Sequence, residues 1–123
     1  MNSNTKNDVR SIADLLTNYE TALRARDAEG CADCYAENTE YVAGGMAPVR
    51  GRAGVADLHR QIFDAGFEIE NIVTNETTMS GDLAYVRQTL TSNDGQSLAL
   101  LVLRRQADGH WLVHAEAEVA VDA

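Results

Sequence analysis

The half of the chain that follows Gly66 contains only the patterns of β-strands, separated by turn signals. Alternating or β-branched residues fill positions 67–79, 83–91, 97–105 and 110–121. The turns between them contain Ser-Gly-Asp, Asn-Asp-Gly and Asp-Gly, and turns with Asn or Asp before Gly are typical of tight antiparallel hairpins. This half of the sequence therefore predicts a four-stranded antiparallel meander.

Three helical patterns precede these strands. Apolar residues recur every three or four positions over residues 8–26 and again over 53–64, and a short helix is expected between them at residues 28–35. Asp8 or Ser11 has the side chain to cap the first helix, because a carboxylate or hydroxyl oxygen accepts hydrogen bonds from free backbone N–H groups. The helical patterns thus all lie in the first half of the chain.

Helices followed by strands are typical of an α+β domain in which the helices cover one face of the sheet. We expect a single domain over residues 8–121, with residues 1–7 as a flexible N-terminal tail. A further short strand is expected at residues 39–42, where Gly44 and Gly45 end it. A chain of 123 residues is long enough to bury a core without disulfides or metals.

The charge balance limits the partners of the protein. Nineteen acidic residues against ten basic ones give a formal net charge of −9, which repels nucleic acid and anionic membrane surfaces. The longest apolar run, residues 98–103, is far too short to cross a bilayer. The first residues lack a basic segment followed by an apolar one, so we expect no secretory signal and a cytoplasmic location.

Cys31 and Cys34 form a C-x-x-C pattern, which can mark a zinc or redox site. No second Cys or His pair completes four zinc ligands, and no strand precedes the motif as in a thioredoxin-type site. On a helix this spacing puts both sulfurs on one face, which favours core packing. The sequence also lacks a glycine-rich phosphate loop and an H-E-x-x-H motif, so we expect no metal and no cofactor.

Several short segments occur in an order and spacing that resemble the NTF2-like superfamily, in its SnoaL-like and ketosteroid-isomerase-like branch. The resemblance covers roughly residues 9–119 and implies a cystatin-like cone, with three N-terminal helices packed on a curved antiparallel sheet. It also implies a pocket for a small apolar molecule inside the cone and a homodimer formed through the outer sheet face. The segments are Tyr19 with Asp27 eight residues later, residues 35–39 (YAENT), 50–52 (RGR), 81–84 (GDLA) and 104–111.

Part of the catalytic residue set of the ketosteroid isomerases is absent from this sequence. Those enzymes use a tyrosine and a protonated aspartate to stabilise an oxyanion, and a second aspartate to move the proton. The tyrosine falls on Tyr19, but the proton-moving aspartate falls on Ala43 and the other falls at or near Leu101. We therefore do not expect steroid isomerisation by that route.

Two helices each carry one polar-tipped residue in an otherwise apolar stripe, Tyr19 in the first and His59 in the third. A buried hydroxyl or imidazole without a partner costs about 1–3 kcal/mol. One hypothesis is a hydrogen-bonded cluster of Tyr19, His59 and Tyr35 at the pocket. The alternative is that all three are core residues whose polar atoms are bound by backbone or water.

The sequence does not decide which face of the last strand points into the cone. Strict alternation puts His114, Glu116 and Glu118 on one face and the apolar set that includes Trp111 on the other. If the acidic face points into the cone, burial raises the pKa of a carboxyl group toward that of a general base. The alternative places this face at solvent or at a dimer surface. On the strand at residues 83–91, alternation favours Gln88 over Arg87 as the inward residue.

Two classes of function follow. The first is an enzyme that isomerises, cyclises or dehydrates an apolar metabolite, in which Tyr19 and His59 stabilise charge on oxygen and Glu116 or His114 moves a proton. The second is a non-catalytic domain that binds a hydrophobic ligand or supports a dimer. The residues expected to line the pocket are Tyr35, Met46, Phe63, Gln88, Leu101, Trp111 and Glu118.

Overall fold

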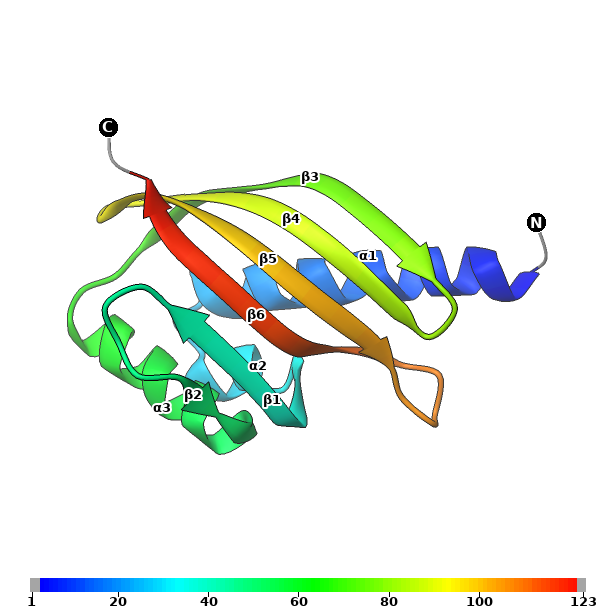
Figure 1. Ribbon diagram of the computed structural model, residues 1–123. Helices are drawn as coiled ribbons and strands as arrows, with labels where there is room; N and C mark the ends of the chain where they lie inside the picture. Colours follow the sequence, from blue (N-terminus) through cyan, green and yellow to red (C-terminus); the bar gives the residue numbers. More distant parts are fainter. Residues whose placement is uncertain (1–2, 122–123) are drawn as a thin grey trace.

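The computed structural model describes residues 3–121 as three helices and six strands (Figure 1). The helices are α1 (Ser3–Arg24), α2 (Ala28–Ala32) and α3 (Gly51–Asp64). The strands are β1 (Tyr35–Ala43), β2 (Val49–Arg50), β3 (Ile69–Ser80), β4 (Leu83–Ser92), β5 (Gly95–Arg105) and β6 (Trp111–Val121). The α+β class and the cystatin-like fold expected from the sequence are confirmed.

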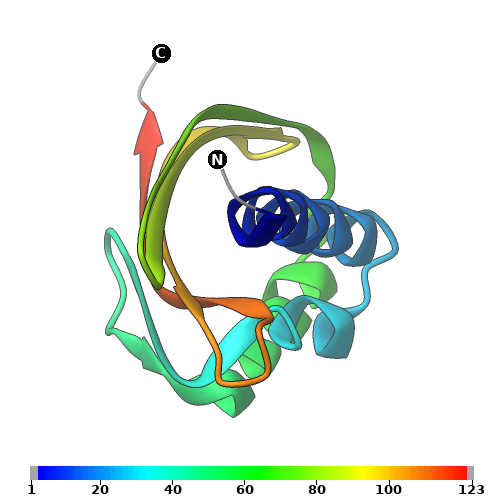
Figure 2. The same cartoon turned by 90° about the vertical axis from the view of Figure 1, so that its right-hand side faces the viewer.

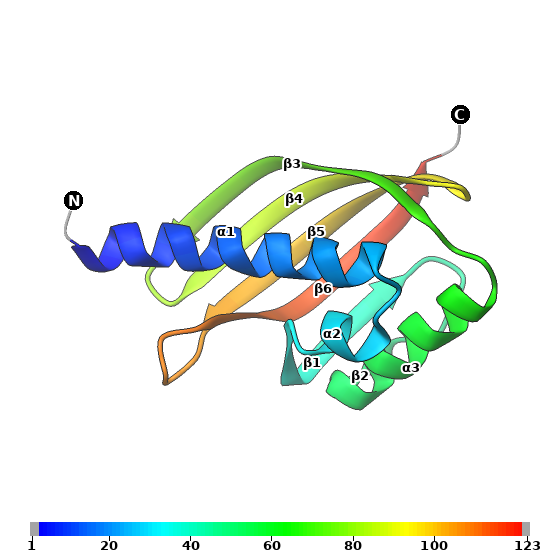
Figure 3. The ribbon, with the colours of Figure 1, turned by 180° about the vertical axis from the view of Figure 1, so that it is seen from behind.

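All six strands form one sheet in the order β2-β1-β6-β5-β4-β3. The meander from β3 to β6 is antiparallel as predicted, but β1 pairs with β6 in parallel, so the sheet is mixed rather than wholly antiparallel. Seen from the end, the sheet curls around α1 (Figure 2), and α2 and α3 lie beside β1 (Figure 3). The concave inner face is therefore the helix-covered one.

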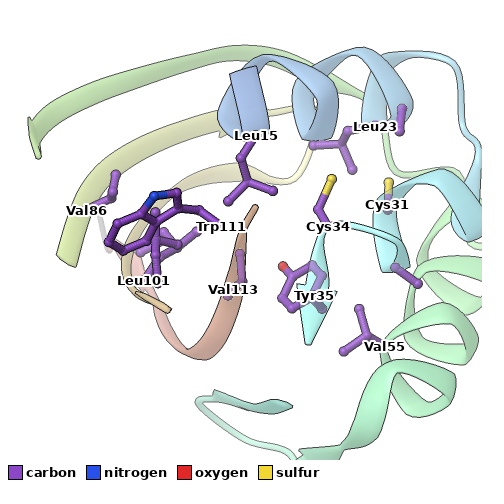
Figure 4. Packing of buried hydrophobic residues seen from close by; sticks show 14 of the residues in the cluster. Leu15, Leu23, Cys31, Cys34, Tyr35, Val55, Val86, Leu101, Trp111 and Val113 are labelled. Atoms are coloured by element: carbon purple, nitrogen blue, oxygen red, sulfur yellow. The ribbon is translucent and has the colours of Figure 1, made fainter. Parts of the chain in front are cut away.

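The core lies between the inner sheet face and the helices. Val86 and Leu103 have no exposed surface, and Trp111 is 2 % exposed. Figure 4 shows Trp111 beside Leu101, and Tyr35 between Cys34 and Val55. Burial of large apolar side chains of this kind is the main term that stabilises the fold.

Helix α1 begins earlier than the sequence predicted. It starts at Ser3, so residues 3–7, expected to belong to a flexible tail, are helical, while residues 1 and 2 lie outside the described part of the chain. Asp8 does not cap this helix: its carboxylate accepts a hydrogen bond from the indole N–H of Trp111 at 3.1 Å. This contact ties α1 to the start of β6.

Helix α2 is shorter than expected. Asp27 caps it by accepting a hydrogen bond from the backbone N–H of Gly30, and the helix ends at Ala32, so Tyr35 opens β1 rather than closing a helix. Cys31 and Cys34 are free thiols buried in the core, as the packing interpretation predicted. Burial raises the pKa of Cys31 to about 12 and that of Cys34 to about 11, so both stay protonated.

No helix within residues 3–121 combines the length and the apolar content needed to cross a bilayer.

Candidate functional site

A β-bulge at His114 determines which side chains of β6 face the core. Val113 pairs with Leu103 and Ala115 pairs with Val102, so His114 is an extra residue between the two pairs. Trp111 and Val113 point inward before the bulge, and Glu116 and Glu118 point inward after it. The strict alternation assumed from the sequence is wrong here, because a bulge moves the following residues to the opposite face.

The two inward glutamates form hydrogen bonds with hydroxyl groups of neighbouring strands. Glu116 is 7 % exposed, and its Oε1 accepts from the Tyr35 hydroxyl at 2.5 Å. Glu118 accepts from the Tyr41 hydroxyl at 2.8 Å and from the Ser97 hydroxyl at 2.7 Å. We refer to these five residues as the carboxyl network.

Burial raises the pKa of Glu116 from an ordinary value near 4.5 to about 8. The negative charge of Glu118 raises it further, while the hydrogen bond from Tyr35 acts in the opposite direction. At neutral pH the Glu116 carboxyl therefore holds its proton most of the time. A carboxyl group that titrates near the working pH is suited to exchange protons with a substrate.

Tyr19 and His59 meet beside this network. The Tyr19 hydroxyl lies 2.9 Å from Nε2 of His59, and Nδ1 of His59 lies 2.8 Å from the carbonyl oxygen of Val55. A carbonyl oxygen only accepts, so Nδ1 carries the ring hydrogen. Burial lowers the pKa of His59, which leaves the ring neutral and Nε2 as an acceptor. The Tyr19 hydroxyl therefore donates to His59.

The structure brings the rings of Tyr19, His59 and Tyr35 together, as the cluster hypothesis supposed. Their centroids are 6.0 Å apart for Tyr19 and Tyr35, 5.7 Å for Tyr19 and His59, and 6.3 Å for Tyr35 and His59. The hydrogen bonds differ from the hypothesis, because the Tyr35 hydroxyl binds Glu116 and not His59. Two adjoining pieces result: the Tyr19–His59 pair and the carboxyl network.

Comparison with known proteins identifies the family. The model of the SnoaL-like domain matches residues 16–114, which is most of the chain. The chain belongs to the SnoaL-like domain family. The NTF2-like superfamily that the sequence resembles is thereby confirmed. No functionally curated protein matches this chain.

Solved structures share the fold at low sequence identity. A ketosteroid isomerase-like protein from Erwinia carotovora atroseptica SCRI1043 is 20% identical, with 93% of this chain and 96% of that chain covered and a TM-score of 0.78. A domain of unknown function with a cystatin-like fold from Nostoc punctiforme PCC 73102 is 19% identical, with coverage of 94% and 78% and a TM-score of 0.82. An NTF2-like protein from Novosphingobium aromaticivorans is 23% identical, with coverage of 97% and 85% and a TM-score of 0.77. At these identities the likeness shows the fold alone.

A groove of about 440 Å³ opens on the inner face of this SnoaL-like domain, between α1 and strands β3 and β4. Gln88 lines it and donates a hydrogen bond to the Thr74 hydroxyl at 3.1 Å. Arg87 faces the other way and pairs with Glu76, so the inward orientation that alternation favoured for Gln88 is the one observed. The other lining residues are mainly apolar and include Ile12, Leu16, Ile72 and Met79.

The remaining residues expected at the site lie in several places. Phe63 packs against His59, with ring centroids 6.1 Å apart. Leu101 and Trp111 are buried in the apolar core. Met46 is 40 % exposed, in the turn between β1 and β2. His114 is half-buried at the bulge, where its backbone carbonyl accepts a hydrogen bond from Thr39.

Sequence reasoning missed Tyr41 and Ser97 as site residues. Tyr41 pairs with Glu116 across the parallel β1–β6 ladder, and that pairing joins segments far apart in the chain. The signal that could have found Tyr41 is its place in the short predicted strand, two residues before Ala43, onto which the proton-moving aspartate of the ketosteroid isomerases falls. Ser97 has no comparable signal in its local pattern.

The raised pKa of Glu116 makes the stability of the fold depend on pH. Between about pH 4.5 and pH 8 the folded protein binds more protons at this group than the unfolded chain, so stability falls as pH rises, by at most about 1.4 kcal/mol per pH unit. We expect Glu116→Gln to flatten this slope in urea unfolding curves recorded from pH 4.5 to pH 9.

Glu118→Gln is the matched variant for this measurement. It removes the charge that raises the pKa of Glu116 in the folded protein, so the fall in stability should begin at the same pH, set by the unfolded chain, and end at lower pH than in the unmodified protein. An unchanged slope in Glu116→Gln would show that Glu116 ionises in the folded protein as it does in water.

Proposed function

We propose that this SnoaL-like domain is an enzyme that moves protons on a small, largely apolar molecule bound on the inner face of its sheet. The reaction is an isomerisation, cyclisation or dehydration that needs no cofactor. The single observation behind the proposal is the carboxyl network, in which Glu116 accepts a hydrogen bond from Tyr35 and Glu118 accepts one from Tyr41 at the inner sheet face. Two adjacent carboxyl groups that share a site titrate at different pH values and can act as acid and base.

In a dehydration, one carboxyl group would act as the base and the other as the acid. Glu118 would accept the proton of the carbon next to a carbonyl group, while Glu116 would give its proton to the departing hydroxyl, which leaves as water. A carbon–carbon double bond forms between the two carbons. Transfer of one proton from Glu118 to Glu116 then restores the starting state. Glu116 and Glu118 both point inward from β6, and the charge of Glu118 acts on Glu116, so the two carboxyl groups are near neighbours for this transfer.

The groove would hold the apolar body of the substrate. Gln88, Ala99 and Glu118 are paired in register on β4, β5 and β6, so Gln88 and Glu118 stand two strands, about 10 Å, apart on the same face. The small side chain of Ala99 lies between them. A compact bicyclic molecule is of the right length to extend from the groove to the carboxyl network.

Tyr19 and His59 would bind an oxygen atom of the substrate. The hydrogen of Tyr19 points to His59 in the structure, so Tyr19 stabilises a negatively charged oxygen only after this hydrogen turns away from His59. His114 contributes its backbone to the bulge, and we assign it no step.

We expect the protein to eliminate water from alicyclic β-hydroxyketones, followed as the rise of enone absorbance in the ultraviolet. Glu116→Gln should lower the rate about 10²-fold or more, as loss of a general acid does, and Tyr19→Phe should lower it less. Glu37→Gln is the control, since Glu37 is an exposed glutamate on β1 outside the network. Equal rates in the Glu116→Gln variant and the control would exclude the proposed acid.

A second proposal concerns the outer face of the sheet, which no helix covers in Figures 1 and 3. Large apolar side chains are exposed there, and exposed apolar patches mark sites of interaction with other proteins. We propose that a second copy of the chain covers this face to form a homodimer, and this supports a scaffold role in addition to catalysis. The exposed residues are Val73, Leu83, Tyr85, Leu98, Leu100, Val119 and Val121.

Leu100→Asp should convert the dimer to a monomer, because it places a charge in the apolar contact. Light scattering coupled to size exclusion at micromolar concentration measures the mass. Val9→Asp, which adds the same charge at an apolar residue 55 % exposed on α1, should leave the dimer intact. A monomeric unmodified protein contradicts the dimer proposal but leaves the proposed reaction untouched.

A further inference from the structure

The carboxyl network and the adjoining Tyr19–His59 pair form the polar end of the inner site. The tyrosine and serine hydroxyl hydrogens there are all bound by acceptors of the protein itself. Burial keeps the phenols of Tyr19, Tyr35 and Tyr41 protonated by raising their pKa values. Each therefore has one hydrogen to donate, and so does Ser97. These hydrogens go to His59 Nε2, Glu116 Oε1, Glu118 Oε1 and Glu118 Oε2 respectively.

The direction of the Tyr19 bond matters most, because an imidazole nitrogen can donate or accept. The contact of His59 Nδ1 with the Val55 carbonyl places the ring hydrogen on Nδ1 and leaves Nε2 without one. Tyr19 is half-buried, whereas His59 is 3 % exposed. The atom that Tyr19 presents to a ligand is thus its oxygen, with lone pairs free, and not its hydrogen.

The two carboxyl groups of the network have no cationic partner within the described part of the chain. Among the ion pairs of residues 3–121, none involves Glu116 or Glu118. Arg26 donates to the backbone carbonyls of Phe63 and Phe67, and Arg52 donates to the backbone carbonyl of Tyr35. A ligand with a carboxylate group would therefore meet acceptors and negative charge, with no cation to balance it.

We infer that Tyr19 binds a neutral alcohol, whose hydroxyl donates a hydrogen bond, in preference to the matching ketone, and that this end of the site rejects the matching carboxylate. An alcohol can donate to the free lone pairs of Tyr19 without disturbing any protein hydrogen bond. At Tyr19 a ketone can be bound only if the tyrosine hydrogen leaves His59, and an acceptor left buried without a partner is costly. The inference rests on the proposed function only for the location of the site.

Three bicyclic probes that differ in one group test the inference: 2-decalol, 2-decalone and decalin-2-carboxylate. Titrations followed by protein NMR at neutral pH give a dissociation constant for each. We expect the alcohol to bind about tenfold more tightly than the ketone, the factor that one unsatisfied buried acceptor produces. We expect the carboxylate to bind more weakly than either.

His59→Phe is the decisive variant, because it removes the acceptor of the Tyr19 hydrogen and frees that hydrogen for a ligand. The preference for alcohol over ketone should shrink or reverse in this variant. Phe63→Leu is the control, since it changes an apolar neighbour of His59 and leaves the Tyr19–His59 bond in place. Ketone binding as tight as alcohol binding in the unmodified protein, or an unchanged preference in His59→Phe, would overturn the inference.

A measurement on the unmodified protein covers the case in which His59→Phe does not fold. The ¹⁵N chemical shifts of the His59 ring should report a hydrogen on Nδ1 and none on Nε2, and the reverse result contradicts the inference. The two proposals can also fail separately. Preferential alcohol binding without water elimination contradicts only the proposed reaction, whereas elimination that depends on Glu116 together with a ketone preference contradicts only the inference made here.

Discussion

The single extra residue at His114 is the constraint on which the rest of the site depends. Without it, Trp111 and Val113 would still face inward, and strict alternation along β6 would place Glu116 and Glu118 on the outer sheet face. With it, the same strand packs Trp111 and Val113 into the core and then directs two carboxyl groups into the cone. Bulges are used in this way next to functional sites because they redirect side chains without ending the strand.

Carboxyl groups in this position need compensation, and the surrounding strands provide it. Tyr35 and Tyr41 come from β1, which is paired in parallel with β6, and Ser97 comes from β5. Each hydroxyl satisfies a carboxyl oxygen that would otherwise be unpaired in a poorly hydrated interior. The raised pKa of Glu116 shows that the compensation is incomplete, and departures of this kind from the most stable arrangement concentrate at functional sites.

Much of the fold could be predicted from the sequence, because its signals are local. The Asn-Asp-Gly and Asp-Gly turns fixed the hairpins of the meander, and the apolar spacing fixed α1 and α3. The parallel pairing of β1 with β6 could not be predicted in this way, because it joins segments about 75 residues apart with no turn between them. For the same reason the sequence does not predict Tyr41 as a member of the site, and the local pattern around Ser97 carries no signal for it. The bulge could not be predicted either, because the residues around His114 continue the alternating pattern of β6.

The central claim, that Glu116 is a buried carboxyl group in a hydrogen-bonded network, is tested most directly by its own titration. The ¹³C shift of the Glu116 side-chain carboxyl, recorded by NMR between pH 3 and pH 10 and assigned through Glu116→Gln, should follow a pKa of about 8. A midpoint near the ordinary value of 4.5 would place the carboxyl group in water and contradict the account.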